Sequence, residues 1–387
     1  MPICLRASLA LALALTGSGA AASRPEPIQE TQPEEVARGV FVFPSFNATE
    51  NLVDGNATIV IGARAVLLVD APSPRLTREH LAWLRRHTTL PIKYLVQTHW
   101  HTDHTRGTST VTDAFPNVAI LASEYTRRIG GRRIPPIIRQ FGGDFVDSAI
   151  ARVTRRVATG LDPQGKPASQ FDLDRSRRMV GYLTRELPDY KTQRYVPPTE
   201  TIESERMIDL GGRTVIVRKY PGHTPGDLVV IVPDGGVVIT GDLVVHPVPY
   251  GTENTVFRKW SQSLVALEKL PGIRTIVPGH GAVLHTWDYA RLEREAIDSM
   301  MAQANAAVLD GLSYEAALAR LDMSRFRTLF AGSDPERQWA FDNYFLGYRR
   351  AFDEASGLVA DTDRTDRRRR SESPLLVCSK ASVPSSP

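Results

Sequence analysis

Four short apolar segments of this 387-residue chain are each followed by histidine or aspartate side chains that can bind a metal ion. They cover residues 92–96, 214–217, 237–240 and 274–277, and their β-branched residues and flanking turn residues are typical of strands. Strands that end at one edge of a sheet bring the following residues together, and neighbouring glycines allow the backbone to turn sharply there. We therefore expect all four strand ends to converge on one site.

The remaining strand and helix patterns fall into two groups along the chain. Strands are predicted at 40–43, 57–61, 65–69, 118–121, 201–210 and 228–232, and helices at 77–87, 260–270 and 289–309. Two groups of strands, each accompanied by helices, favour two sheets packed face to face with helices on the outside. The predicted fold class is α+β.

Two helical regions interrupt or extend this pattern. The first is a basic insert at about 125–198, which has 13 Arg and two Lys but only seven acidic residues between Arg127 and Arg194. Its helical segments alternate with breaks such as Ile134-Pro135-Pro136. Its arginines fit either a solvated helical face or a lid that favours anionic substrates. The second is a C-terminal extension at 311–358, with helices predicted at 314–321 and 336–354.

Both ends of the chain differ in composition from its middle. A basic start, an apolar run and small residues up to Ala22 predict a signal peptide at 1–22, because the run is too short to span a bilayer. The chain is therefore expected to be periplasmic or secreted, without stable membrane insertion. The tail 361–387 combines four consecutive arginines with Ser and Pro and is predicted to be disordered.

Charge and cysteine content exclude other classes of protein. The net charge of +4 is modest and its excess arginine is local, which argues against a nucleic-acid partner. The two cysteines, Cys4 and Cys378, lie at opposite ends, so we expect neither a disulfide framework nor a cysteine metal ligand. A small-molecule substrate is the expected partner, and the oligomeric state is not predicted.

The run His99-Trp100-His101-Thr102-Asp103-His104 is the strongest chemical signal. Neutral imidazoles and carboxylates suit Zn²⁺, and a short loop can turn several of them inward. Further candidates follow the later strands: His223 in Gly-His-Thr-Pro-Gly, Asp242 after Gly241, and His280 in Gly-His-Gly. The whole set in this order is far more specific than any single histidine.

The order HxHxDH, GHTxG, Gly-Asp and GHG resembles the metallo-beta-lactamase superfamily, over roughly residues 40–309. The resemblance implies an αββα sandwich at 36–310 with its site at one edge of the two sheets. It also implies that His99, His101 and His223 hold one zinc ion, and that Asp103, His104 and His280 hold a second. Asp242 would bridge both ions, and Asp70 would orient a ligand.

The resemblance also implies a mechanism. A hydroxide shared by two Zn²⁺ ions would attack a carbonyl or phosphoryl centre. Asp103 and Asp242 would offset the metal charge, and Asp103 could relay a proton to the leaving group. Tyr250, on a loop after Asp242, is a weaker candidate for binding a substrate carbonyl.

The substrate class follows from departures within the family. Asp242 stands where true β-lactamases generally have Cys or Ser, and His101 stands where flavodiiron oxidoreductases have a carboxylate. The expected activity is hydrolysis of a small carboxylic derivative such as a lactone, thioester or ester. A β-lactamase or amidase activity is the first alternative, and a non-catalytic metal-binding protein is the second.

Overall fold

The computed structural model describes residues 32–45, 54–344 and 347–358. The predicted signal peptide, both cysteines and the predicted disordered tail lie outside these residues. No helix of the described ranges is both long and apolar enough to cross a bilayer.

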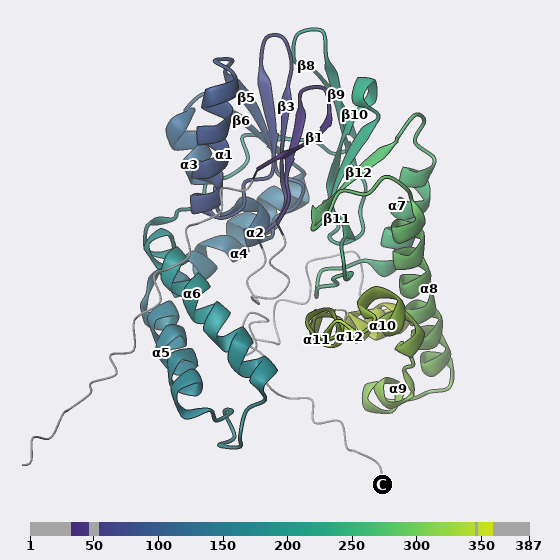
Figure 1. The fold of residues 1–387 in the computed structure, drawn as a ribbon. Coiled ribbons are helices and arrows are strands. Elements are labelled where there is room, and N and C mark those ends of the chain that lie inside the picture. The colour runs from purple at the N-terminus through teal and green to yellow at the C-terminus, as the bar shows by residue number, and fades with distance from the viewer. Residues whose placement is uncertain (1–31, 46–53, 345–346, 359–387) are drawn as a thin grey trace, which may run out of the picture. The chain divides into compact units, whose positions relative to one another are not determined.

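Two sheets form the centre of the structure (Figure 1). The seven-stranded sheet contains, in spatial order, β1 (Glu34–Ala37), β2 (Val40–Phe43), β3 (Ala57–Ile61), β4 (Val66–Val69), β5 (Ile92–Val96), β6 (Ala119–Ala122) and β7 (Glu200–Thr201). The five-stranded sheet contains β12 (Thr275–His280), β11 (Val237–Val245), β10 (Leu228–Val232), β9 (Thr214–Lys219) and β8 (Glu205–Asp209). In both sheets antiparallel and parallel pairs are mixed.

Apolar residues on both faces of the central strands explain the layered packing. Successive side chains of a strand point to opposite faces. In β10, Leu228, Val230 and Val232 pack into the core between the sheets, whereas Val229 and Ile231 pack against the outer helices. Strand β4 is divided in the same way between two cores. Strands that are apolar throughout therefore require cover on both sides.

Helices supply that cover on each outer face. On the seven-stranded sheet, α1 (Pro74–His87) buries Leu81, Trp83 and Leu84, and α3 (Thr108–Ala114) packs beside it. On the five-stranded sheet, α7 (Phe257–Glu268) and α8 (Asp288–Leu309) bury the larger core. The arrangement confirms the predicted sandwich of two sheets between helices.

The insert is helical, but its first helix is longer than the sequence indicated. It forms α4 (Glu124–Gly142), α5 (Asp144–Thr159) and α6 (Gln170–Thr192). The break expected at Pro135-Pro136 was wrong, because α4 continues through both prolines. A proline inside a helix removes one backbone hydrogen bond and clashes with the preceding turn, which destabilises the helix. In α4, burial of Ile129 and Ile134 against Trp100 offsets part of this destabilisation.

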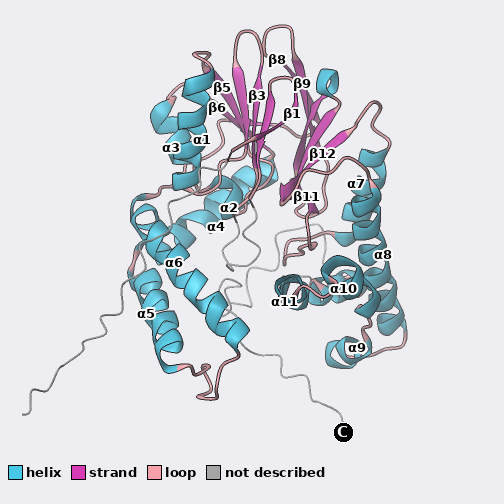
Figure 2. Ribbon diagram, in the orientation of Figure 1, coloured by secondary structure: helices cyan, strands magenta, loops and turns pink. Residues whose placement is uncertain are grey.

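The C-terminal extension also differs from its prediction. It contains α9 (Tyr314–Arg320), α10 (Ser324–Ala331), α11 (Pro335–Tyr344) and α12 (Tyr348–Ala355), which lie on the side of α8, opposite the insert helices α5 and α6 (Figure 2). The expected 336–354 helix is two helices, and α10 was not predicted. Gly347 precedes α12 where a Cβ would lie 2.3 Å from Phe257 Cζ, so only glycine fits this close approach. Asp334 caps the start of α11, since its Oδ1 accepts the Glu336 amide at 2.9 Å.

Glu293 on α8 is a fully buried carboxyl, and among the described residues no charged side chain pairs with either of its oxygens. Burial raises the pKa of Glu293 well above 4.5; the Val245 backbone opposes this shift and the charge of Asp242 adds to it. Above pH 4.5 the unfolded chain releases a proton that the folded protein keeps, so folding becomes less favourable as the pH rises.

We expect Glu293→Gln to stabilise the metal-free protein at pH 8 and to have little effect near pH 4. Between the two pKa values of Glu293 the difference should grow by about 1.4 kcal/mol per pH unit. Urea denaturation of both proteins in chelator at several pH values measures it. An equal difference at every pH would show that Glu293 does not carry this proton.

Candidate metal centre

Most of the predicted site residues lie at or just after the ends of three strands in the two sheets, β5, β9 and β12. His99 and His101 follow β5, and the short helix α2 (Thr102–Thr105) then places Asp103 and His104. His223 follows β9, and His280 is the last residue of β12.

Asp242 differs from its expected position at a strand exit. Strand β11 continues past it to Val245, and its pairing with β12 is irregular on either side of Gly241. Gly241 has a φ of +53°, which glycine adopts readily. This local break occurs immediately before Asp242.

His99, His101, His223 and one oxygen of Asp242 form a first donor set. The Nε2 atoms of His99 and His223 lie 2.9 and 3.0 Å from Nδ1 of His101. The nearer Asp242 oxygen, Oδ2, lies 3.4 Å from Nε2 of His223 and 3.7 Å from Nε2 of His99.

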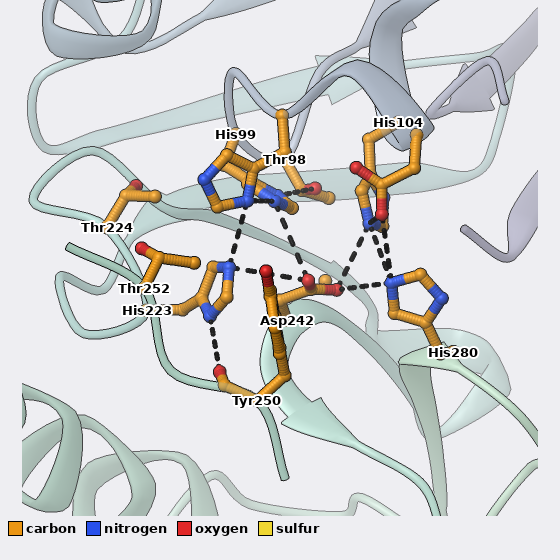
Figure 3. A network of polar contacts seen from close by, with 12 residues as sticks. Thr98, His99, His104, His223, Thr224, Asp242, Tyr250, Thr252 and His280 are labelled. Carbon is orange, nitrogen blue, oxygen red and sulfur yellow. Dashed lines mark hydrogen bonds and ion pairs between the residues drawn. The ribbon is translucent and has the colours of Figure 1, made fainter. Parts of the chain in front are cut away.

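Asp103, His104, His280 and the other oxygen of Asp242 form a second donor set. The Nε2 atoms of His104 and His280 are 3.2 Å apart, and Oδ2 of Asp103 lies 3.3 Å from Nε2 of His280. Asp242 Oδ1 lies 3.1 Å from His104 Nε2 and 3.4 Å from His280 Nε2. In Figure 3 the Asp242 carboxylate lies between His223 on one side and the His104–His280 pair on the other.

Most of the imidazoles are oriented by a contact at the other ring nitrogen. Nδ1 of His223 lies 3.0 Å from the Tyr250 carbonyl, and Nδ1 of His280 lies 3.1 Å from the Asp54 carbonyl. Nδ1 of His104 faces Asp70 Oδ2 at 2.8 Å. A hydrogen bond at Nδ1 fixes the ring and leaves the lone pair of Nε2 free for a metal ion.

Asp70 links both donor sets. Its carboxylate contacts His104 and also accepts the amide and hydroxyl of Thr98, each at 2.8 Å. The Thr98 hydroxyl lies 3.0 Å from Nδ1 of His99. Asp70 adopts a φ of 60°, an uncommon conformation outside glycine that is seen more often for Asp and Asn. The structure thus brings Asp70 to the contacts that an orienting residue needs.

The histidines of the first set are neutral. Burial lowers the pKa of His99 well below 6.5, the pKa of His101 to about 4 and the pKa of His223 to about 3. Their lone pairs are therefore available at neutral pH.

The second set carries excess negative charge, which its histidines neutralise. Burial opposes the charged imidazoles, but Asp242 and the neighbouring carboxylates raise the pKa of His104 well above 6.5 and that of His280 to about 9. Burial likewise opposes ionisation of Asp103, but His104 and His280 lower its pKa to about 2. A divalent cation bound to this set would displace protons from the two histidines.

The donor atoms fit Zn²⁺. Ligand atoms about 2.0–2.1 Å from a tetrahedral Zn²⁺ lie roughly 3.3 Å apart. The separations given above for the two sets run from 2.9 to 3.7 Å, and all donor atoms of a set lie within 4.8 Å of one another. Each of the two sets could therefore hold one metal ion.

The sequence model of the metallo-beta-lactamase superfamily matches residues 51–280, more than half of the chain. The chain belongs to this superfamily. Members are hydrolases, so the protein is an enzyme of that class with a His/Asp site able to hold metal.

Two solved structures are similar to this superfamily member. The sec-alkylsulfatase Pisa1 from Pseudomonas sp. is 17% identical with a TM-score of 0.55, covering 87% of this chain. This chain spans about half, 52%, of the alkylsulfatase's length. A metallo-beta-lactamase from Pontibacter korlensis is 17% identical with a TM-score of 0.48, covering 69% of this chain and 98% of its own. At this identity the alkylsulfatase supports the fold alone.

The segment Asp54-Gly55-Asn56, which the sequence does not mark as part of the site, also contacts the proposed ligands. Asn56 is buried, and its side-chain amide donates to the carbonyls of Pro278 and Gly281 at 2.9 Å, on either side of His280. The segment reads as an ordinary turn in the sequence. Only the packing of residues more than 200 positions apart shows its role.

Tyr250 contacts the centre through its backbone. The described contact is the carbonyl that orients His223, and the two rings lie 5.9 Å apart. A role of the Tyr250 hydroxyl in substrate binding stays a prediction.

Proposed function

We propose that this enzyme is a dinuclear zinc hydrolase that cleaves a small carboxylic derivative: a lactone, a thioester or an ester. The observation that carries the proposal is the position of Asp242, which directs one oxygen to each donor set. One bridging carboxylate, five histidines and Asp103 make up the proposed ligands of the two ions. Bound Zn²⁺ would supply an activated water molecule and would polarise the bond that is cleaved.

The two carboxylates differ in accessibility, which supports different roles. The Asp242 side chain is 1% exposed, whereas that of Asp103 is 24% exposed. Asp242 is therefore suited to holding ligands, and Asp103 can accept the proton of the attacking water and deliver it to the leaving group. Asp70, through Thr98 and His104, keeps the imidazoles in place.

The test is a hydrolysis panel on zinc-loaded protein with Asp103→Asn as the variant. The panel contains acyl-homoserine lactones, a glutathione thioester, a chromogenic cephalosporin, a phosphodiester and, because an alkylsulfatase shares the fold, a secondary alkyl sulfate. General acid–base catalysis contributes about 10²–10⁴-fold, so kcat on the best substrate should fall by at least about 100-fold in the variant.

Asp113→Asn is the matched control, since Asp113 is exposed and ion-paired with Arg194 on the surface. Turnover of the cephalosporin ahead of every lactone, ester and thioester would replace the proposal with the β-lactamase alternative. Full activity of Asp103→Asn would refute the catalytic role of Asp103. Metal binding without turnover of any compound would favour the non-catalytic alternative.

We also propose that the enzyme acts in the periplasm or outside the cell. The basic and apolar start of the chain supports this localisation. The mass of the protein recovered outside the cytoplasm should correspond to a chain that begins at Ser23. A mature chain that keeps residues 1–22 would contradict cleavage.

A further inference from the structure

The segment Asp54-Gly55-Asn56 contacts the ligands of the second donor set. The Asp54 carbonyl lies 3.1 Å from Nδ1 of His280, and the Gly55 amide donates to the Asp103 carbonyl at 3.0 Å. A Cβ on Gly55 would lie 2.4 Å from Cε1 of His104, so the backbone lies directly against that ring. Asp103, His104 and His280 thus all depend on where this segment lies.

The position of the segment depends in turn on the Asp54 carboxylate. The side chain is fully buried and has three donors: the Ser73 amide at 3.0 Å, the Arg106 guanidinium, and the Tyr182 hydroxyl at 3.1 Å. A buried carboxylate is tolerated only when its oxygens are paired in this way. These donors therefore hold Asp54, and with it the carbonyl that orients His280.

Arg106 connects the same network to the motif loop and to the insert. It follows His104 by two residues, and it donates to the hydroxyls of Tyr190 at 2.6 Å and Tyr182 at 3.1 Å. Asp54, Arg106 and Tyr182 close a ring of hydrogen bonds, because each contacts the other two. A closed ring of this kind fixes its members more firmly than separate pairs do.

Both tyrosines belong to α6 and are anchored in the core of the insert. Tyr182 and Tyr190 are buried there with Phe141, Val146 and Leu183. Burial also raises the pKa of both hydroxyls above 10, so they stay protonated at neutral pH. The insert thus presents two rigid, neutral hydroxyl groups to the Asp54–Arg106 pair.

We propose that Tyr182 and Tyr190 of the helical insert are positioning residues for the second metal site. They act through Arg106 and Asp54 on His280, and so on the set formed by Asp103, His104, Asp242 and His280. His99 and His223 of the first set are oriented by other groups, the Thr98 hydroxyl and the Tyr250 carbonyl. The inference rests on the proposed function, because it requires two metal ions.

The experiment compares Tyr182→Phe, Tyr190→Phe and the double variant with the unaltered protein. Each change removes a hydroxyl and keeps the ring that packs the insert. Zn²⁺ affinity is measured by titration against a competing chelator, and the absorption bands of the Co²⁺-substituted protein report the two sites separately. Groups that orient a ligand contribute about 10–100-fold in affinity. The affinity of the second ion should fall by that amount, and that of the first should not change.

Tyr348→Phe is the matched control. Tyr348 is as buried as Tyr182, and its hydroxyl donates to the Ala317 carbonyl at 3.4 Å within the C-terminal helices. The Tyr348→Phe variant should lose one buried hydrogen bond without any change in metal affinity. If the Tyr182 and Tyr190 variants also bind both ions with unchanged affinity, the tyrosines only stabilise the fold and the inference is wrong.

Metal counting on the unaltered protein separates this inference from the proposed function. Fewer than two ions per chain would overturn the dinuclear proposal, and the positioning role would be lost with it. Suppose that the unaltered protein binds two ions and that the tyrosine variants lose zinc affinity equally at both sites. This result would leave the proposed function intact and would overturn the selective role of the insert.

Discussion

Replacing Asp242 with alanine is expected to lower the affinity for both metal ions by more than about 100-fold and to abolish hydrolysis. Groups that only orient a ligand already contribute about 10–100-fold, and Asp242 has one oxygen within 3.4 Å of a donor nitrogen in each set. Its loss would also leave His104 and His280 without the carboxylate whose charge raises their pKa. Metal content after dialysis and kcat/KM on the best substrate measure the two effects.

Asp234→Ala is the control for that variant. Asp234 precedes β11 and pairs with Arg213 at the surface, so its removal should change neither metal content nor turnover. Two firmly bound zinc ions in Asp242→Ala would contradict a bridging role. Loss of only one ion would show that Asp242 serves a single set.

Trp260→Ala should destabilise the fold by about 3–5 kcal/mol, the usual cost of removing a buried tryptophan. Trp260 is 1% exposed, and its indole nitrogen donates to the Leu243 carbonyl at 2.9 Å. Its ring lies 5.7 Å from that of His223, and Leu243 directly follows Asp242. The cavity would therefore open beneath two of the proposed ligands, and urea denaturation of the metal-free protein measures the loss.

Trp260→Phe keeps most of the apolar area but not the indole donor. We expect it to cost less than the alanine variant, because the cavity is smaller and only one hydrogen bond is lost. If both substitutions lower the free energy of unfolding by less than about 1 kcal/mol, the packing of Trp260 would contribute little to stability and the prediction would be wrong.

The strands and the seven candidate ligands could be predicted because each depends on a local pattern. His99, His223 and His280 follow short apolar segments that end in turn residues, and such segments form strands in most contexts. Asp242 was found by the same reasoning although β11 does not end there. The conformation of Gly241 places Asp242, and the φ of a glycine cannot be read from the sequence.

The groups that hold the ligands could not be predicted, because they depend on contacts between distant segments. Tyr182 reaches Asp54 across 128 positions, and Asn56 reaches Pro278 across 222. A turn, a helical arginine and a tyrosine carry no local sign of such a partnership. The continuous α4 and the divided C-terminal helix have the same cause, since tertiary packing outweighs local preference at Pro135 and at Gly347.

The packing of α6 has a consequence for engineering. A designer who wished to alter specificity would regard residues 124–192 as an exchangeable cassette, because they form a separate group of helices with their own apolar core. The hydroxyls of two residues in that core also satisfy Arg106 and Asp54. A transplanted or shortened cassette would leave a buried guanidinium and a carboxylate short of partners within the catalytic scaffold. Chimeras of this enzyme should therefore retain α6 and the buried residues of α4 and α5 that pack against it as native sequence, and confine variation to exposed positions and the connections.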